Sequence, residues 1–410
     1  YYDRVTQMDS LVGDLLDELD SLGLADNTIV FYYSDHGGVL GRSKRFLYET
    51  GTHVPLIVRI PEKYKDFYPT SGPGSEVDRL VSFVDLAPTL LSLAGKEAPG
   101  YMQGRAFLGE HVGEPHDYIY MYRDRMDERY DLSRSIVDGK FRYTRNYNPN
   151  RIYLQHLDYL WRAPSMRSWE EACLNGECNE VQGRWWGTKP AEELYLIEED
   201  PWEVNNLAGD PAYSGQLERM RKAHLEIARS VLDAGFIPEA DRQERAGETA
   251  VYDYMRKEEV PLGEITEAAL AASSGNPANL ERFTEWIHHE DGAVRYWAAH
   301  GMLQLGAAAG PALESVKKAA EDPFLNVTAV GAETLYRLGY KEEAIDAFRR
   351  VLESDDPMAR TYALNCIDHM EGTPGEFLDL CTAIIRDYEE LDRGRQYDIR
   401  MLKWLFTKWE

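Results

Sequence analysis

The sequence predicts a mixed α/β region over residues 1–112, a small antiparallel α+β region over 113–235 and an all-α region over 236–410. Three observations lead to this division. The first region alternates helical and strand-like apolar patterns, the second carries short strand-like runs rich in tyrosine, and the third repeats small residues at a fixed spacing. Each pattern is typical of one fold class, because helices and strands place their apolar residues at different periods.

The first region begins with a helix and then two strands. Between Val5 and Leu22 the apolar residues recur with helical spacing, and Gly23 ends the predicted helix. Residues 29–33 are an unbroken β-branched and aromatic run, which predicts a buried strand. A second strand is expected at 54–60, and a helix capped by an aspartate at 85–95. This order is typical of part of an α/β sheet.

The second region is predicted to form a small antiparallel sheet. Asp138-Gly139 separates two of its strand-like runs and is a strong hairpin signal. A helix is expected from about Gly215 to Ala234. The predicted strands are 118–122, 135–137, 141–143 and 195–197.

The third region repeats a pattern of small and apolar residues. The segment that contains Ala298 and Ala299 recurs after 33 residues around Leu335 and after a further 32 around Ile367. This period predicts stacked helix pairs resembling HEAT-like repeats, with these four residues inside; an irregular helical bundle is the alternative. The charge run 239–248 is interpreted as a polar linker before the repeats.

Composition restricts the partners of the protein. Lys and Arg number 45 and Asp and Glu 71, so the net charge is −26, which disfavours nucleic acid and anionic membranes. No apolar stretch approaches the roughly 18 residues of a membrane-spanning helix. Cys173 and Cys178 flank a turn-forming Asn-Gly pair and are compatible with a local disulfide or with free thiols. Cys366 and Cys381 fall on apolar helix positions and are expected in the core.

The candidate chemical residues follow the first predicted strand. Asp35 is a hard oxygen ligand suited to Ca²⁺ or Mg²⁺, and His36 adds a nitrogen ligand. Gly37 and Gly38 let a ligand approach the backbone, and Lys44 is a point charge for an anionic group. A structural aspartate in a strand-end turn is the alternative for Asp35. Phosphate-loop, Gly-x-Ser-x-Gly, zinc-helix and EF-hand motifs do not occur in the sequence.

These segments resemble the type I, formylglycine-dependent sulfatases of the alkaline phosphatase superfamily. The similar stretches run, in order, as YYDRVTQMDSLVGDLLDELDSLGLADNTIVFYYSDHGG, KRFLYETGTHVPLIVRIP, VSFVDLAPTLLSLAG, DLSRSIVDGKFRYTRNY and ELYLIEEDPWEVNNLAGDP. The resemblance covers about residues 1–230 and implies part of an alkaline-phosphatase-like sandwich, then the family's C-terminal antiparallel subdomain. Residues 236–410 would be an appendage of some members.

The resemblance also implies roles for particular residues. Asp35 and His36 match the family's ligands of a divalent metal, usually calcium, with magnesium as the alternative. Lys44 precedes Tyr48 by four residues, which is the family's spacing for the lysine that binds the substrate sulfate. The family's nucleophile is a formylglycine made from a Cys/Ser-x-Pro-x-Arg motif, and that motif is absent here. We therefore expect a fragment that is inactive by itself, with the formylglycine in a missing N-terminal part.

The function that the resemblance implies is hydrolysis of sulfate esters of a sugar or glycan by an exported protein, periplasmic or extracellular. The alternatives are a phosphate or phosphonate ester hydrolase of the same superfamily, and an inert sulfatase-like protein whose helical repeats bind a protein partner or a second copy.

Two groups of residues are candidates for substrate contact. The charged turn Arg123, Asp124, Arg125 and Asp127 either reaches the pocket and binds sugar hydroxyls or forms a solvated ion-pair cluster. An aromatic-rich insertion lies at 153–186. Its rings either stack on sugars or pack in the core: Tyr153, Tyr159, Trp161, Trp169, Trp185 and Trp186.

Overall fold

The computed structural model describes residues 2–70, 72–257, 260–370, 374–388 and 397–409. The chain divides into two compact units, which are described separately. Unit 1 comprises Tyr1–Gly38, Thr50–Ile119 and Val137–Gly139, and unit 2 comprises Val39–Glu49, Tyr120–Ile136 and Lys140–Glu410. The division into regions 1–112, 113–235 and 236–410 stays a prediction. Every helix in the described ranges is too short or too polar to span a bilayer.

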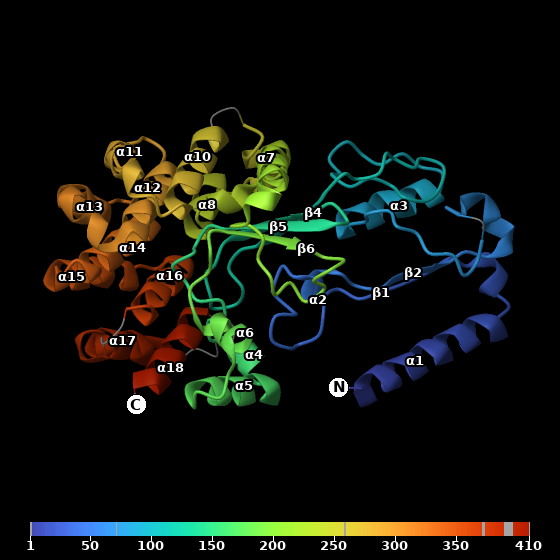
Figure 1. The fold of residues 1–410 in the computed structure, drawn as a ribbon, viewed down its shortest axis with the longest axis horizontal. Helices are drawn as coiled ribbons and strands as arrows, with labels where there is room; N and C mark the ends of the chain where they lie inside the picture. The colour runs from blue at the N-terminus through green and yellow to red at the C-terminus, as the bar shows by residue number, and fades with distance from the viewer. Residues whose placement is uncertain (1, 71, 258–259, 371–373, 389–396, 410) are drawn as a thin grey trace. The chain divides into compact units, whose positions relative to one another are not determined.

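Unit 1 contains the helices and strands predicted for the start of the chain, each within a few residues of its expected bounds (Figure 1). Strands β1 and β2 pair antiparallel, with Val30 opposite Arg59 and Tyr33 opposite Leu56. The elements are α1 (Tyr2–Ser21), η1 (Ala25–Asn27), β1 (Val30–Tyr33), α2 (Glu49–Thr52), which begins one residue before this unit, β2 (Leu56–Arg59), η2 (Glu62–Phe67), η3 (Phe83–Asp85) and α3 (Leu86–Leu93).

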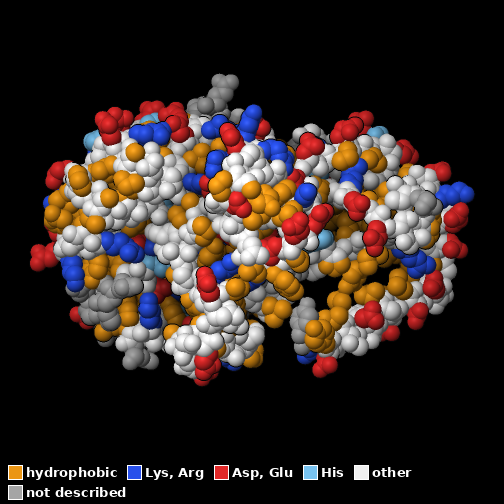
Figure 2. Space-filling view, in the orientation of Figure 1, with side chains coloured by type: hydrophobic (Ala, Val, Ile, Leu, Met, Phe, Trp, Pro, Cys, Tyr) orange, Lys and Arg blue, Asp and Glu red, His pale blue; other side chains and the backbone are white. Residues whose placement is uncertain are grey.

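The prediction of a buried strand at 29–33 is wrong for the described unit. Strand β1 is only half-buried, its last residue Tyr33 is exposed, and β2 is mostly exposed. The described sheet of this unit has two strands, so the apolar run has no second sheet neighbour to cover it. Helix α1 likewise buries none of its residues, and its Leu11 and Leu15 are exposed. Hydrophobic side chains are visible along this helix at the lower right of Figure 2.

Asp85 does not cap α3 with its side chain as the sequence predicts. Its carboxylate accepts hydrogen bonds from the backbone N–H of Ser82, 2.8 Å away, and of Arg105, 2.7 Å away. His116 Nε2 lies 3.0 Å from the same buried carboxylate. The Asp85 carboxylate therefore holds the loops around α3 to one another and makes no capping hydrogen bond to the first turn of α3.

Unit 2 is built on a sheet whose described strands lie in the order β3-β4-β5-β6. Strands β4 and β5 are neighbours joined by Asp138, Gly139 and Lys140, and Gly139 has a φ of 89°, as the predicted hairpin requires. Strands β5 and β6 pair antiparallel, with Phe141 opposite Leu196. The strands are β3 (Ile119–Arg123), β4 (Ser133–Val137), β5 (Phe141–Asn146) and β6 (Glu192–Leu196).

The insertion before β6 is a group of short helices. Of the two states open for Cys173 and Cys178, the structure shows the disulfide, which closes the turn after α5. The elements are α4 (Asp158–Trp161), α5 (Pro164–Leu174), α6 (Glu180–Gly183) and η4 (Arg184–Trp186).

The rest of unit 2 is helical. It begins with η5 (Pro211–Tyr213), α7 (Ser214–Ser230) and η6 (Ala234–Phe236). The prediction of a polar linker at 239–248 is wrong, since residues 239–246 form helix α8. Two charges of this helix are paired, Glu239 with Arg125 and Arg245 with Asp291. The remaining elements are α8 (Glu239–Ala246), α9 (Val251–Tyr254), α10 (Leu262–Ser273), η7 (Pro277–Asn279), α11 (Leu280–Trp286), α12 (Gly292–Leu305), η8 (Gly306–Ala312), α13 (Leu313–Ala320), α14 (Leu325–Arg337), α15 (Lys341–Leu352), α16 (Pro357–Asp368), α17 (Pro374–Tyr388) and α18 (Tyr397–Trp409).

These helices pack in a regular succession. Helices α10, α12, α14, α16 and α18 each contact the next, and α11, α13 and α15 pack beside them. Ala298, Ala299, Leu335 and Ile367 are buried, which confirms that they lie inside the helical region. Its HEAT-like character stays a prediction.

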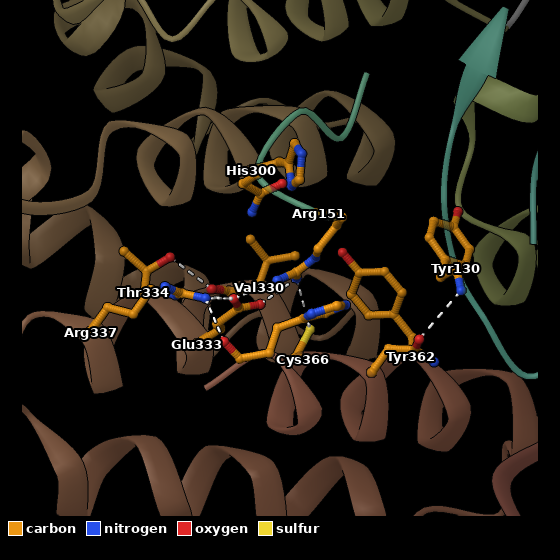
Figure 3. A network of polar contacts seen from close by, with 12 residues as sticks. Tyr130, Arg151, His300, Val330, Glu333, Thr334, Arg337, Tyr362 and Cys366 are labelled. Carbon is orange, nitrogen blue, oxygen red and sulfur yellow. Dashed lines mark hydrogen bonds and ion pairs between the residues drawn. The ribbon is translucent and has the colours of Figure 1, made fainter. Parts of the chain in front are cut away.

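The helical region and the sheet of unit 2 share one core. Arg151, which follows β5, donates to both carboxylate oxygens of Glu333 in α14, and its guanidinium also lies 3.8 Å from the thiol of Cys366 in α16 (Figure 3). The indole N–H of Trp297 donates to the Phe236 carbonyl at 2.8 Å. Apolar residues of the sheet region and of the helices belong to one continuous cluster. The helices are therefore part of the same folded body as the sheet.

Candidate functional site

Asp35 and His36 lie just after β1, in a turn that glycines complete. His36 Nε2 is 3.3 Å from Asp35 Oδ2. The Asp35 side chain is 82% exposed and that of His36 32% exposed, so a ligand can reach both. The N–H of Gly37 donates to the carbonyl of Gly51 at 3.1 Å and holds the turn against α2. The two side chains therefore converge on one point at the end of the strand.

The orientation of His36 suits a cation ligand. Its Nδ1 lies 2.6 Å from the carbonyl oxygen of Gly37, which can only accept, so Nδ1 carries the hydrogen. In the neutral ring, Nε2 then directs its lone pair at the Asp35 carboxylate. Both groups thus offer lone pairs that a divalent cation could accept. A third His, Cys, Asp or Glu ligand is not brought to the pair within the described residues.

Lys44 belongs to unit 2 and is described there, apart from Asp35 and His36. It is half-buried, and its ammonium lies 3.3 Å from the hydroxyl of Tyr159 and 4.7 Å from the centre of that ring. The guanidinium of Arg45 stands over the same ring at 5.1 Å. Tyr159 of α4 therefore limits where the ammonium can go, and its ring accepts both cations in cation–π contacts.

The backbone around Lys44 is strained. Arg42 and Arg45 have φ values of 66° and 79°, and their partners Glu203 and Asp127 have 51° and 48°. These are four of the five non-glycine residues with positive φ in the described part of the chain. Such conformations cost of order 1–3 kcal/mol each and persist only where surrounding contacts enforce them. Arg45 forms an ion pair with Asp127, and an Arg42 Nη donates to the carbonyl of Trp202 beside Glu203.

A buried carboxylate holds the far end of this loop. Glu203 accepts the backbone N–H of Glu49 at 2.7 Å, and its carboxylate lies 2.6 Å from Arg142 Nε. Burial raises the pKa of Glu203 to about 7, although the Arg142 charge opposes this rise. The loop 39–49 is thus fixed at Arg45 and again at Glu49.

The aromatic insertion packs under the same loop. Tyr153, Trp161 and Trp185 are buried, so they serve the core and are not free to stack on a sugar. Burial raises the pKa of Tyr48 well above its ordinary value, and its hydroxyl donates to Glu193 at 2.8 Å. A Cβ on Gly41 would lie 2.4 Å from the ring of Trp169, so this close approach requires glycine. The insertion therefore packs against the Lys44 loop.

The charged turn 123–127 makes ion pairs within the protein. Arg123 lies 3.6 Å from Asp131 and is buried. Asp124 lies 2.7 Å from Arg134, Arg125 Nε donates to Glu239 at 2.6 Å, and Asp127 pairs with Arg45. Arg123 is buried and the other three side chains are half-buried, so the four residues form an ion-pair cluster that is partly exposed to solvent.

The sequence alone does not connect Lys44 with Tyr159, or Arg45 beside it with Asp127. Neither a positive φ at an arginine nor a pairing between distant segments leaves a mark in the sequence. The one sequence feature that indicated a second cation at this site is Arg45, directly after Lys44.

Comparison with known proteins gives a consistent result. Residues 1–96 match the Sulfatase family model. The chain is 40% identical over 241 residues to an ulvan-active sulfatase of Formosa agariphila, covering 58% of this chain and 39% of that relative. It is 40% identical over 108 residues to the N-acetylglucosamine-6-O-sulfatase of Bacteroides thetaiotaomicron, covering 25% of this chain and 18% of that relative. The chain thus spans well under half the length of these relatives.

A solved structure described as a complex with its substrate D-glucosamine-2-N,6-O-disulfate is 24% identical, with a TM-score of 0.39, covering 55% of this chain and 39% of that one. The family match includes the turn that carries Asp35 and His36 and the loop that carries Lys44. Residues 1–96 therefore carry the Sulfatase family match, and the curated relatives to which the chain is similar are sulfatases.

Proposed function

We propose that the protein to which this chain belongs hydrolyses sulfate esters of a sugar or glycan. The observation that carries the proposal is that the sulfatase match over residues 1–96 contains Asp35, His36 and Lys44 together. Two curated relatives support a sugar substrate, because their names specify ulvan and N-acetylglucosamine-6-O-sulfate chemistry. The disulfide Cys173–Cys178 supports export, since disulfides persist in oxidising compartments.

Lys44 is the residue that would bind the sulfate group. Negative charge builds on the sulfate oxygens and on the leaving oxygen as the ester bond breaks, so a fixed ammonium stabilises the transition state more than the ground state. Tyr159 restricts the ammonium beforehand, which reduces the entropy that must be lost when the sulfate binds. Lys44 thus acts by electrostatic stabilisation and not by proton transfer.

Asp35 and His36 would hold a divalent cation, calcium or magnesium, through Oδ2 and Nε2. The donor set fits as part of a site, because a carboxylate and an imidazole nitrogen converge, and a divalent cation would need further oxygen ligands beside these two. Such a cation supplies Lewis-acid stabilisation of oxyanions. A formylglycine elsewhere in the complete protein would supply the nucleophile, so we expect the chain of 410 residues to be inactive alone.

Among the charged turn, Asp124 is the best placed for a sugar hydroxyl. Its side chain is 30% exposed, whereas Arg123 is buried against Asp131 and Arg125 is engaged with Glu239. A carboxylate with one oxygen in an ion pair still has lone pairs for a hydroxyl donor.

The test is sulfate release from sulfated mono- and oligosaccharides by the full-length protein, matured with a formylglycine-generating enzyme. We expect release from at least one sulfated sugar. Turnover of phosphate or phosphonate esters without sulfate release would favour the related hydrolase activity. Binding of a sulfated sugar without any turnover would favour the inert binding protein.

A further inference from the structure

Helix α18 contacts the turn that supports Lys44. Arg400, in α18, lies 3.6 Å from the carboxylate of Asp127 and 3.6 Å from that of Glu128. The guanidinium of Arg125 stands over the ring of Tyr397, at the start of α18, at 4.2 Å. All these residues belong to unit 2 and are described. The end of the helical region therefore contacts the charged turn through several side chains.

One path from Arg400 leads to the residue after Lys44. Asp127 forms an ion pair with Arg400 through one carboxylate oxygen and with Arg45 through the other. Arg45 and Asp127 both have positive φ, so each depends on this contact to hold an unfavourable backbone conformation. A carboxylate shared by two guanidiniums, with its side chain 23% exposed, is fixed more tightly than one that pairs with a single mobile cation.

A second path leads to the aromatic ring against Lys44. Glu128 is buried and accepts the backbone N–H of Asp158 at 2.6 Å, at the first residue of α4. The next residue of α4 is Tyr159, which contacts the Lys44 ammonium. Arg400 compensates the buried Glu128 charge, since an unpaired buried carboxylate is costly. Arg400 thus contacts both carboxylates, Asp127 that pairs with Arg45 and Glu128 that accepts the N–H next to Tyr159.

We infer that Arg400 is a positioning residue for Lys44, and that the helical region sets the geometry with which the protein binds the sulfate group. The inference rests on the proposed function, because it assumes that Lys44 contacts the substrate. Arg400 itself touches no reacting atom. Its effect passes through Asp127 to Arg45 and through Glu128 to Tyr159.

The experiment is a double-mutant cycle in the matured full-length protein. Arg400→Gln removes the charge that serves both paths. Lys408→Gln is the matched control, because it removes a cation from the same helix that pairs with Asp368 and not with the turn at 127–128. Each substitution is made with Lys44 intact and with Lys44→Ala. The readouts are kcat and KM for sulfate release and the midpoint of thermal unfolding.

We expect Arg400→Gln to lower kcat/KM about ten-fold relative to Lys408→Gln, since displacing a catalytic group by 1 Å can cost 10²-fold. In the Lys44→Ala background the same change should alter kcat/KM less than about two-fold, because the group through which it acts is gone. The two single variants at positions 400 and 408 should unfold at similar temperatures.

The other outcomes separate the inference from the function on which it rests. If Lys44→Ala alone has no effect, the sulfate-binding role fails and the inference fails with it. If Lys44→Ala slows release but Arg400→Gln behaves like Lys408→Gln, the function stands and the inference is overturned. An equal loss in both backgrounds also overturns it, because Arg400 would then act on the fold as a whole.

A second measurement does not depend on activity. The amides of Ser43 and Phe46 donate to backbone carbonyls within the loop, at 3.2 and 3.0 Å. Arg400→Gln should raise their hydrogen-exchange rates at least about three-fold, because these bonds break when the loop opens. Unchanged exchange at both amides would overturn the inference.

Discussion

Arg151 and Glu333 form a buried two-pronged ion pair between the sheet region and helix α14 of unit 2. Arg151 Nη1 donates to Glu333 Oε1 at 2.7 Å, and Nη2 contacts the other oxygen. Arg337 donates two further hydrogen bonds to the same carboxylate, at 3.1 and 2.9 Å (Figure 3). Burial raises the pKa of Glu333, but the charge and hydrogen bonds of Arg151 together with the Arg337 charge outweigh burial and lower the pKa to about 2. The carboxylate is therefore ionised throughout the neutral range.

Replacing Arg151 with methionine should destabilise unit 2 strongly. The Glu333 charge would stay buried with only the partly exposed Arg337 as partner, so we expect a loss of about 3 kcal/mol. Chemical denaturation measures the change. Arg162→Met removes the exposed pair with Asp158 and is the control, with an expected loss below about 1 kcal/mol. Equal losses at the two positions would show that burial of the pair does not matter.

Gly331→Ala should destabilise the helical region. A Cβ there would lie 2.4 Å from the backbone nitrogen of Ala320, so α13 and α14 would have to separate, at a cost of about 1–3 kcal/mol. Gly263→Ala in α10 is the matched control, because nothing lies within 4 Å of its Cβ position. That change should stabilise the protein by up to about 1 kcal/mol. A thermal shift of the same sign in both variants would contradict the predicted close approach.

His224→Phe should reduce the loss of stability in weak acid. His224 is fully buried, and burial, with the nearby Arg134 charge, lowers its pKa to about 3. The unfolded chain binds a proton at this residue below about pH 6.5 and the folded chain does not. Stability is therefore complete above pH 6.5 and falls with pH from there toward 3. At pH 5 this residue accounts for a loss of about 2 kcal/mol.

Between pH 8 and pH 5, the free energy of unfolding of His224→Phe should therefore decrease by about 2 kcal/mol less than that of the wild type. Denaturation curves at the two pH values for both proteins give the comparison. An identical pH dependence in the two proteins would mean that His224 is protonated in the folded state.

Lys44→Ala in the matured full-length protein should slow sulfate release by about 10²–10³, the cost of losing one electrostatic donor at a developing charge. Tyr159→Phe should have a much smaller effect, because the ring that faces the ammonium remains and only the 3.3 Å contact with the hydroxyl is lost. Steady-state kinetics and unfolding temperatures check both. Wild-type kinetics in Lys44→Ala would mean that the sulfate binds elsewhere.

Asp35→Asn should weaken the binding of calcium by at least about ten-fold, because the amide lacks the charge that holds the cation opposite His36. The readout is the calcium concentration needed to raise the unfolding temperature of the full-length protein. Asp26→Asn is the control, since that carboxylate is exposed in the same unit. A calcium response that is the same in all three proteins would contradict the metal role of Asp35.

The helical region shows what can be predicted from sequence. The 33- and 32-residue offsets placed Ala298, Leu335 and Ile367 on buried helix faces, and the structure confirms this. The prediction works because close helix packing requires small residues at a regular period. The hairpin at Asp138-Gly139 was predictable for a similar reason, since the local backbone requires positive φ.

Other features depend on contacts that are distant in sequence. The polar composition of 239–248 predicts a linker, yet residues 239–246 form a helix. Its Glu239 pairs with Arg125 and its Arg245 with Asp291. The apolar sequence of β1 predicts a buried strand, yet the strand is only half-buried, because burial also requires a second neighbouring strand. The strain at Arg45 and its contact with Asp127 could not be predicted, because an arginine in the left-handed region has no sequence signature.

The buried arginines that face the helical region set a limit on how the protein can be shortened. Arg129 pairs with Asp368 at 2.6 Å, and Arg145 donates to the Ser273 hydroxyl and the Leu270 carbonyl. A version truncated after residue 235 would expose these guanidiniums and the apolar surface around them to water. Such a protein would be prone to aggregate during expression, so a catalytic part intended for biotechnological use should keep its helices.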